Sequence, residues 1–208
     1  DLHSFPTRRS SDLVGERHAV SEWLRKVSDI APVVIVRGNH DALGDLPLLA
    51  KLRTQHPIIV EEACAVHHVA GVAIACVAWP RTSALLATLG AVPHGVAASA
   101  ARQALQSILA AMADDLTAAT GPRVLLSHAM VTAAVTSHGQ PLVGCDMELG
   151  FADLAMARAH VCLLGHIHKS QSWRFDGATM IYPGSPYRTS YGEMDADQIG
   201  RASCRERV

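Results

Sequence analysis

The sequence is poor in aromatic residues, carries almost no net charge and contains no long apolar run. Aromatic residues make up 4% of its 208 positions, and the formal net charge is −1. Neither a base-stacking platform nor a basic surface for nucleic acid or anionic membrane is therefore indicated. The longest apolar runs, such as 32–36 and 161–164, have the length of strands, which excludes a membrane-spanning helix. A hydrophobic content of 49% excludes a disordered chain.

Paired cysteine motifs are also missing. The five cysteines are odd in number and widely spaced, and no two of them form a C-x-x-C pair. Neither a disulfide framework nor a zinc ribbon is therefore predicted. The first residues contain no apolar segment of the kind found in signal peptides. We therefore expect a protein of the reducing cytoplasm.

The two ends differ in composition from the sequence between them. Residues 1–13 and 199–208 are polar, rich in arginine and serine, and follow no periodic pattern. Both resemble translated sequencing adapters, and ordinary flexible tails are the alternative. We expect a partial domain over residues 14–198 between two non-native tails, in a chain whose natural sequence begins further upstream.

Hydrophobic periodicity predicts short buried strands that alternate with helices. Val20, Trp23, Leu24 and Val27 fall on one helix face, which we expect to be buried. Helix-then-strand units followed by a late hairpin predict α/β layering around sheets. The expected strands are 33–36, 58–60, 65–69, 72–77, 124–126, 160–164, 172–175 and 179–182, and the other expected helices are 45–52, 97–119 and 152–158.

Three of the expected strands lead directly into polar residues that can bind metal. They are followed by Asn39-His40-Asp41, by His128, and by His166-Ile167-His168. Loops at the carboxyl ends of strands form the ligand sites of layered α/β folds. Imidazole nitrogen and amide oxygen suit manganese, iron or zinc. If the backbone stays extended, His166 and His168 should face one site while Ile167 turns away.

These residues resemble the motifs of a known family. Gly38-Asn39-His40-Asp41, His128 and Gly165-His166-Ile167-His168 resemble, in this order, the last three motifs of calcineurin-like metallophosphoesterases. Tyr182-Pro183-Gly184-Ser185-Pro186 with residues 187–193 resembles the nuclease branch, which is the exonuclease component of SbcCD-type DNA repair complexes. The resemblance covers residues 16–193. It implies a layered αββα sandwich with mixed β-sheets, here truncated at its N-terminus.

The resemblance implies a two-metal site. Asn39, His128 and His166 would ligate one divalent ion and His168 the other. Mn²⁺ is the favoured metal, with Mg²⁺, Fe²⁺ and Zn²⁺ as alternatives. Such a pair lowers the pKa of a bridging water and clamps the attacking and leaving oxygens of a phosphodiester.

Other residues would act on the substrate. The resemblance implies that His40 stabilises the transition state or protonates the leaving oxygen, and that Asp41 orients the ring of His40. A neighbouring carboxylate fixes the tautomer of an imidazole and favours its protonated form. Tyr187 and Arg188 could contact a phosphate backbone, and an exposed hairpin rim is the alternative interpretation.

The chain departs from the family at its start. The family begins with an Asp-x-His motif and a Gly-Asp-x-x-Asp motif, which supply ligands including the carboxylate that bridges the metals. We expect this chain to lack both upstream of Gly38. The expected consequences are weak metal binding, poor stability, and little or no catalytic activity of these residues alone.

Three functions are compatible with the sequence. The first is a metal-dependent DNA exonuclease that acts on DNA ends with an SbcC-type coiled-coil ATPase, and that could form a homodimer. The second is a metallophosphoesterase acting on a nucleotide, a phosphoprotein or a small phosphodiester, which the lack of a basic stripe favours. The third is a non-catalytic remnant that serves as an interaction domain. The native metal, the cleavage polarity, the endonuclease capacity and the oligomeric state are left open.

Overall fold

The computed structural model of the chain describes residues 10–136 and 147–186. Contacts between residues divide the chain into two compact units. The first unit comprises residues 1–35 and 42–60, and the second comprises residues 36–41 and 61–208. Each unit is described by itself below. None of the described helices is long and apolar enough to span a membrane.

The first unit pairs two short strands and carries two helices. Strands β1 (Val33–Val36) and β2 (Ile58–Glu61) form a two-stranded sheet, and the last residue of each strand belongs to the second unit. The expected strand at 33–36 is thus confirmed. The expected helix at 45–52 is a 3₁₀ helix, η1 (Leu46–Lys51), with a proline in its first turn. The longer helix is α1 (Ser10–Ser28), which includes residues 10–13 of the expected tail.

Helix α1 does not bury the face that the sequence predicts. Leu24 is buried, but Trp23 is 60% exposed and Val20 is 46% exposed. The Ser28 hydroxyl, one turn after Leu24, donates a hydrogen bond of 2.7 Å to the carbonyl of His56. This contact directs the helix face that carries Leu24 and Ser28 inward. Trp23 lies about 100° away around the helix axis and therefore points outward.

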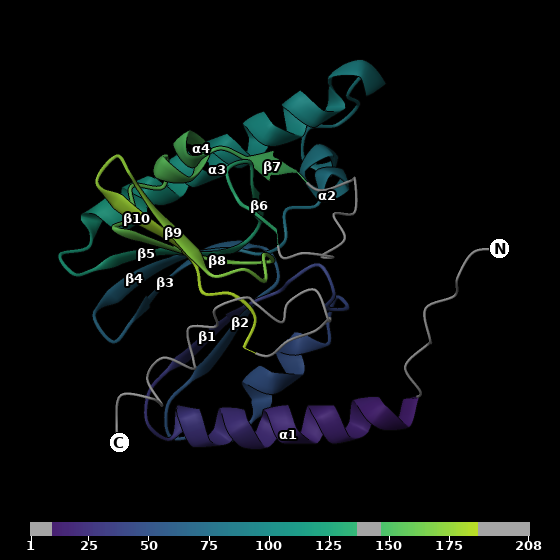
Figure 1. Cartoon of the computed structure of the whole chain (residues 1–208), viewed down its shortest axis with the longest axis vertical. Coiled ribbons are helices and arrows are strands. Elements are labelled where there is room, and N and C mark those ends of the chain that lie inside the picture. The colour runs from purple at the N-terminus through teal and green to yellow at the C-terminus, as the bar shows by residue number, and fades with distance from the viewer. Residues whose placement is uncertain (1–9, 137–146, 187–208) are drawn as a thin grey trace. The chain divides into compact units, whose positions relative to one another are not determined.

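The second unit is built on a six-stranded mixed sheet (Figure 1). Its four inner strands run parallel and its two edge strands run antiparallel to their neighbours. The expected late hairpin is confirmed, and it and a hairpin at 64–77 each close through a two-residue turn, Asp176-Gly177 or Ala70-Gly71, with positive φ at both positions. In spatial order the strands are β3 (Cys64–Val69), β4 (Val72–Val77), β5 (Arg123–His128), β8 (Val161–Gly165), β10 (Ala178–Tyr182) and β9 (Gln171–Phe175).

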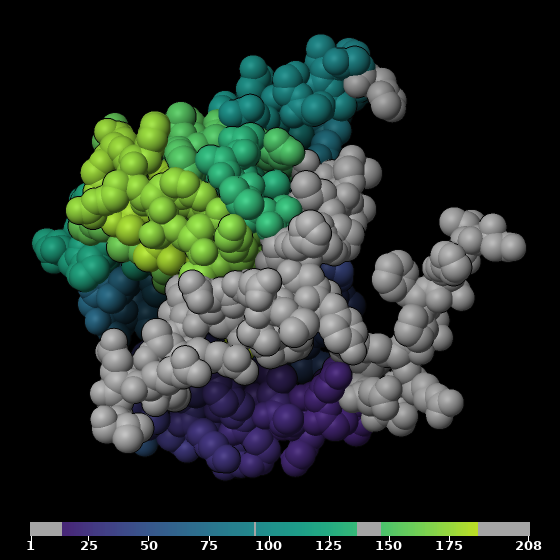
Figure 2. Space-filling view, viewed as in Figure 1, coloured from purple at the N-terminus to yellow at the C-terminus, as the bar shows by residue number. Residues whose placement is uncertain are grey.

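Helices cover one face of this sheet. Helix α3 (Ala97–Ala118) confirms the long helix expected at 97–119 and packs on β3 and β4, while the short α4 (Phe151–Ala155) packs on β9. The beginning of α3 projects beyond the sheet in Figures 1 and 2, where α2 packs against it. The remaining elements are α2 (Thr82–Ala87), η2 (His94–Val96) and a small parallel sheet of β6 (Met130–Val131) and β7 (Glu148–Leu149).

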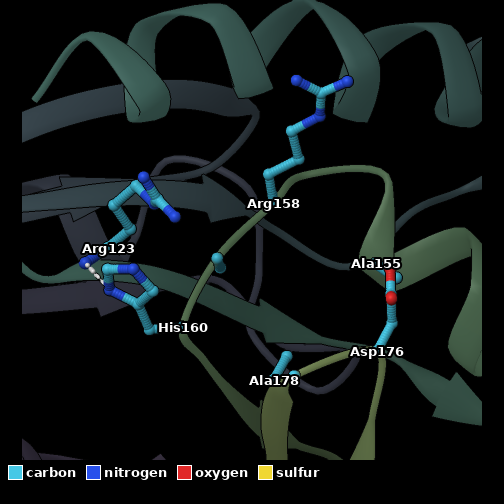
Figure 3. A pocket seen from close by; sticks show the side chains of 8 residues that line it. Arg123, Ala155, Arg158, His160, Asp176 and Ala178 are labelled. Carbon is cyan, nitrogen blue, oxygen red and sulfur yellow. Dashed lines mark hydrogen bonds between the residues drawn. The ribbon is translucent and has the colours of Figure 1, made fainter.

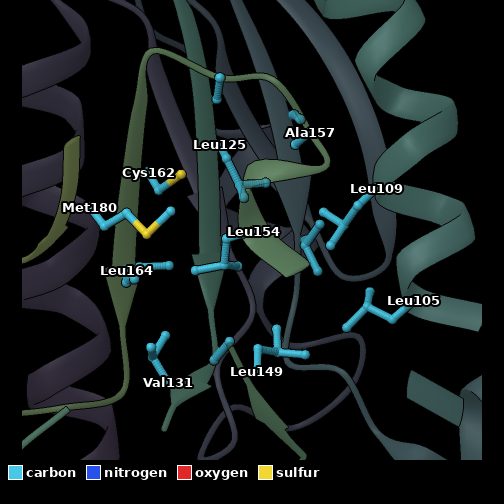
Figure 4. Close-up of a cluster of buried hydrophobic side chains, with 14 of the residues drawn as sticks. Leu105, Leu109, Leu125, Val131, Leu149, Leu154, Ala157, Cys162, Leu164 and Met180 are labelled. Atoms are coloured by element: carbon cyan, nitrogen blue, oxygen red, sulfur yellow. The ribbon is translucent and has the colours of Figure 1, made fainter. Parts of the chain in front are cut away.

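The core of the second unit lies between these helices and the sheet (Figure 4). Because side chains alternate along a strand, Leu125, Cys162 and Met180 point to the same face and are fully buried. They lie in one cluster with Leu105 and Leu109 of α3. Burying each of the larger side chains stabilises the fold by about 1.5–3 kcal/mol. The second unit therefore has the mixed α/β layering that the sequence predicts, while the two-sheet sandwich and the truncation stay predictions.

A buried carboxylate ties α4 to α3. Asp153 accepts hydrogen bonds from the guanidinium of Arg102 (2.7 Å), the amide of Gln106 (2.6 Å) and the backbone N–H of Gly150 (2.7 Å). Burial raises the pKa of Asp153, but these three hydrogen bonds outweigh it and hold the pKa below its usual value. The network therefore holds the start of α4 against α3.

Candidate functional site

The predicted ligands meet within the second unit, at the carboxyl ends of β5 and β8. His128 is the last residue of β5 and lies opposite Gly165, the last residue of β8. Residues 37–41, which follow β1, form the loop that faces these two strand ends. The sheet thus supplies two adjacent strand ends, and the loop brings Asn39 to them.

Asn39 and His128 are in direct contact. The Oδ1 of Asn39 lies 3.0 Å from the Nε2 of His128. This is the length of an N–H···O hydrogen bond. Two ligands at about 2.1 Å from one ion, in neighbouring coordination positions, are also separated by about 3 Å. The pair therefore fits one divalent ion without a large movement of either side chain.

His166 lies beside His128. The centroids of the two imidazoles are 5.3 Å apart, and their planes are inclined at 65°. The backbone at His166 has φ of 98°, a conformation that side chains other than glycine rarely adopt. The condition of an extended backbone is therefore not met at this residue, because β8 ends at Gly165 and the chain bends at His166. Strain of this kind is concentrated at functional sites.

Two glycines make room for the ring of His128. A Cβ on Gly38 would lie 2.8 Å from Cε1 of His128, and a Cβ on Gly165 would lie 2.7 Å from Nδ1 of the same ring. Both distances are shorter than real contacts of a Cβ atom. The glycines that open the two sequence motifs are therefore required by close packing against one imidazole.

His128 is neutral at pH 7. Its burial, and then the positive charges of His166, His40, Arg37 and His168, lower the pKa of His128 to about 4. A ligating imidazole must be neutral, so this ring has no positive charge to lose before it binds a metal near neutral pH. The Nε2 proton that bonds to Oδ1 of Asn39 would then move to Nδ1. The shift also indicates that the predicted histidines act on one another electrostatically.

Asp41 closes the loop that carries Asn39. Its Oδ2 accepts a hydrogen bond of 2.8 Å from the backbone N–H of Gly38, three residues earlier. His40 lies on the same loop and is exposed. The expected role of Asp41 in orienting His40 stays a prediction.

The segment after β10 packs against the loop of His168. The backbone N–H of Ser185 donates to the carbonyl of His168 at 2.9 Å, and a Cβ on Gly184 would lie 2.9 Å from that carbonyl oxygen. The buried Tyr182 donates its hydroxyl to the carbonyl of Ala129, next to His128, at 2.6 Å. The segment from Tyr182 to Ser185 therefore supports both histidine-bearing loops. Tyr187 and Arg188 lie outside the described residues.

Sequence reasoning missed two residues next to the ligands. Arg37 is buried, and its guanidinium donates to the carbonyls of Gly38 (3.1 Å) and Trp79 (3.4 Å). The ring centroid of Trp79 lies 4.9 Å from that of His166 and 5.7 Å from that of His128. Trp79 follows β4, and only long-range contacts reveal it, because no local pattern marks its position.

The donors fit part of a metal site. Asn39, His128 and His166 supply an amide oxygen and two imidazoles, which suit manganese, iron or zinc. Over residues 10–136 and 147–186, however, no group of three or more histidine, cysteine, aspartate or glutamate side chains could hold a metal ion. The described residues thus offer an amide oxygen and imidazoles without a carboxylate among them. A second ion at His168 stays a prediction.

The expected absence of the first two motifs needs one correction. No Gly-Asp-x-x-Asp sequence precedes Gly38, but Asp1-Leu2-His3 does have the Asp-x-His spacing. These three residues lie outside the described part of the chain. The bridging carboxylate expected from the Gly-Asp-x-x-Asp motif therefore has no counterpart in the sequence before Gly38.

A separate cavity of about 300 Å³ lies around the first residues of β5 and β10, at the ends of the strands opposite to His128 and Gly165 (Figure 3). Arg123, Arg158, His160 and Asp176 contribute its polar lining. The backbone N–H of Arg123 donates to Nδ1 of His160 at 3.2 Å. Because this cavity contains none of the predicted ligands, the candidate site is the one at the other ends of the strands.

The chain matches a known protein family. Residues 11–197 match the family profile described as the calcineurin-like phosphoesterase superfamily domain. The matched range includes all three histidine-bearing motifs and every described strand. No curated protein matches the chain.

Proposed function

The chain belongs to the calcineurin-like phosphoesterase superfamily, and from this membership we propose that it is the DNA exonuclease component of an SbcCD-type double-strand-break repair complex. Metal-dependent hydrolysis of phosphoesters is the chemistry of the family. The observation that carries its assignment to this site is the 3.0 Å contact between Asn39 and His128, with His166 beside them. Three donors from distant parts of the chain thus lie close together.

In this proposal Asn39, His128 and His166 hold one divalent ion and His168 holds a second. Bound divalent ions supply an activated water and neutralise the charge of a phosphodiester. The residues of the chain fix the donors: His128 is neutral, and Gly38 and Gly165 confine its ring. The exposed His40 donates a proton to the leaving oxygen or stabilises charge on the phosphorus in the transition state.

The nuclease assignment is supported by the segment from Tyr182 to Pro186. Its sequence resembles that of the nuclease branch, and its Ser185 bonds to the backbone of His168. The segment therefore lies against the loop of His168, which supports its assignment to the proposed site. The partners in this proposal are DNA ends and an SbcC-type coiled-coil ATPase, with Mn²⁺ as the metal.

Residues 1–208 alone should hydrolyse phosphodiesters slowly or not at all. The sequence before Gly38 has no Gly-Asp-x-x-Asp motif to supply the carboxylate that would bridge two ions. Without that negative charge, two cations held close together repel each other strongly. Activity should therefore be tested on the gene product purified from its own cells, with whatever sequence flanks these residues.

A second candidate is hydrolysis of a small phosphodiester. The net charge of −1 and the low aromatic content favour it, because neither a basic stripe nor a stacking surface for DNA is evident. A non-catalytic interaction domain is the third candidate, favoured by the missing carboxylate ligand.

One assay separates these candidates. The gene product and its His128→Ala variant are incubated with Mn²⁺ and either linear duplex DNA or a chromogenic diester. We expect degradation of the DNA, and at least a hundredfold less in the variant, because a lost ligand disturbs metal binding at least as much as a lost supporting contact. Turnover of the diester with intact DNA would favour the second candidate. No hydrolysis of either substrate would favour the third.

A further inference from the structure

We propose that Trp79 is a positioning residue that holds the imidazoles of His128 and His166 in the orientation needed to share one metal ion. This inference rests on the proposed metal site and adds to it a residue outside the sequence motifs. Trp79 is not proposed as a ligand. Its indole would act through the two rings that it contacts.

The backbone of Trp79 is bonded to the loop that carries Asn39. Its N–H donates to the carbonyl of Arg37 at 2.9 Å, and its carbonyl accepts from the Nη2 of Arg37 at 3.4 Å. The Nη1 of Arg37 donates to the carbonyl of Gly38, immediately before Asn39. Because Arg37 is 5% exposed, these bonds are shielded from competing water. Trp79 is thus anchored to the same loop as one ligand.

The side chain of Trp79 contacts the other two ligands. Its ring is tilted by 42° to that of His166, with centroids 4.9 Å apart, and meets His128 edge to face at 73° and 5.7 Å. The two histidine rings are themselves 5.3 Å apart. Each of the three rings therefore touches the other two. Such aromatic pairs are worth about 0.5–1.5 kcal/mol beyond the area that they bury.

This arrangement explains how His166 keeps its direction. His166 has a backbone φ of 98° just beyond the end of β8. A ligating imidazole needs a neighbour that fixes the rotation of its ring. The indole contacts the rings of His128 and His166 together, so it can set the angle between them. A side chain of similar bulk without an aromatic ring would fill the space without that geometry.

The test compares Trp79→Leu, which removes the ring, with Trp79→Phe, which keeps an aromatic ring. Trp23→Leu is the matched control, because Trp23 is exposed on α1. The first measurement records the imidazole signals of His128 and His166 by NMR in the metal-free protein. The second measures the affinity for Co²⁺ by its absorption spectrum. Urea unfolding of each variant monitors stability separately.

We expect Trp79→Leu to move both imidazole signals and to weaken Co²⁺ binding by about tenfold to a hundredfold. Trp79→Phe should restore most of the affinity, and Trp23→Leu should change neither measurement. Unchanged imidazole signals, or equal affinities for Trp79→Leu and Trp79→Phe, would overturn the proposal.

Two further outcomes are also decisive. If Trp79→Leu does not fold, the proposal is tested in the unaltered chain by nuclear Overhauser contacts between the Trp79 indole and the His166 ring. The absence of these contacts would overturn the proposal. If the unaltered chain does not bind Co²⁺, the proposed metal site fails. The metal-free spectra then still show whether Trp79 orders the two rings.

Discussion

The Oδ1 of Asn39 lies 3.0 Å from the Nε2 of His128, although 89 residues separate them in the sequence. One atom belongs to a loop and the other to the end of a central strand of the six-stranded sheet. Their separation suits both a hydrogen bond and a shared metal ion. The same contact therefore holds the metal-free site together and prepares it for an ion.

Replacing Asn39 should reveal this double role. We expect Asn39→Ala to weaken Co²⁺ binding by at least tenfold, because one donor is lost, and Asn39→Asp to bind at least as tightly as the unaltered chain, because it keeps an oxygen and adds a charge. In the cycle with His128→Ala, the two losses in binding free energy should not add. Additive losses would indicate that the two side chains do not share an ion.

Adding a methyl group beside His128 should disturb the site. Gly38→Ala and Gly165→Ala each place a Cβ within 3 Å of the ring, and overpacking of this kind costs about 1–3 kcal/mol in free energy of unfolding. Gly95→Ala is the control, because a Cβ there meets no atom within 4 Å. Urea unfolding measures the change, and an equal effect at all three positions would contradict the packing argument.

Stability without metal should fall as the solution is acidified. In the folded chain the pKa of His128 is about 4, against an ordinary value of 6.5. Between these values the unfolded chain binds a proton that the folded chain excludes, so the free energy of unfolding decreases as pH falls from 6.5 to 4 and is fully retained above 6.5. His128→Gln should flatten this dependence, measured by urea unfolding with a chelator present. The matched control is His68→Gln, at an exposed position on β3, which should leave the dependence intact.

Residues 1–208 should bind Mn²⁺ weakly. The described donors include no carboxylate, and amide oxygens and imidazole nitrogens attract a cation less strongly than carboxylates do. Calorimetric titration should therefore show no tight site, and a chelator should leave the free energy of unfolding almost unchanged, since a ligand below its Kd stabilises little. Two tight sites in this titration would contradict the expectation.

Much of the fold follows from local sequence. The run 33–36 forms β1 with the expected bounds, and both hairpins close at a residue followed by glycine, because a two-residue turn needs positive φ there. Helix α3 follows its amphipathic spacing. The buried face of α1 was not predictable, since the bond from Ser28 to His56, 28 residues away, decides which line of the helix turns inward.

The sequence marks the residues that meet at the site but not the contacts that support them. Asn39, His128 and His166 stand out because each follows an apolar strand. The bend at His166 and the contacts of Arg37 and Trp79 depend on segments that meet only after folding. Hydrophobic periodicity contains no information about contacts between distant segments, so only the structure reveals these features.

Neither of the two units is formed by one continuous segment of the chain. The chain leaves the first unit after residue 35, contributes residues 36–41 to the second, and returns to the first for residues 42–60. Asn39 and His40 thus sit on a six-residue insert flanked on both sides by the other unit. A recombination event with one breakpoint cannot exchange either unit for that of a relative without also replacing part of the other. Exchange of one whole unit would therefore need three breakpoints, after residues 35, 41 and 60.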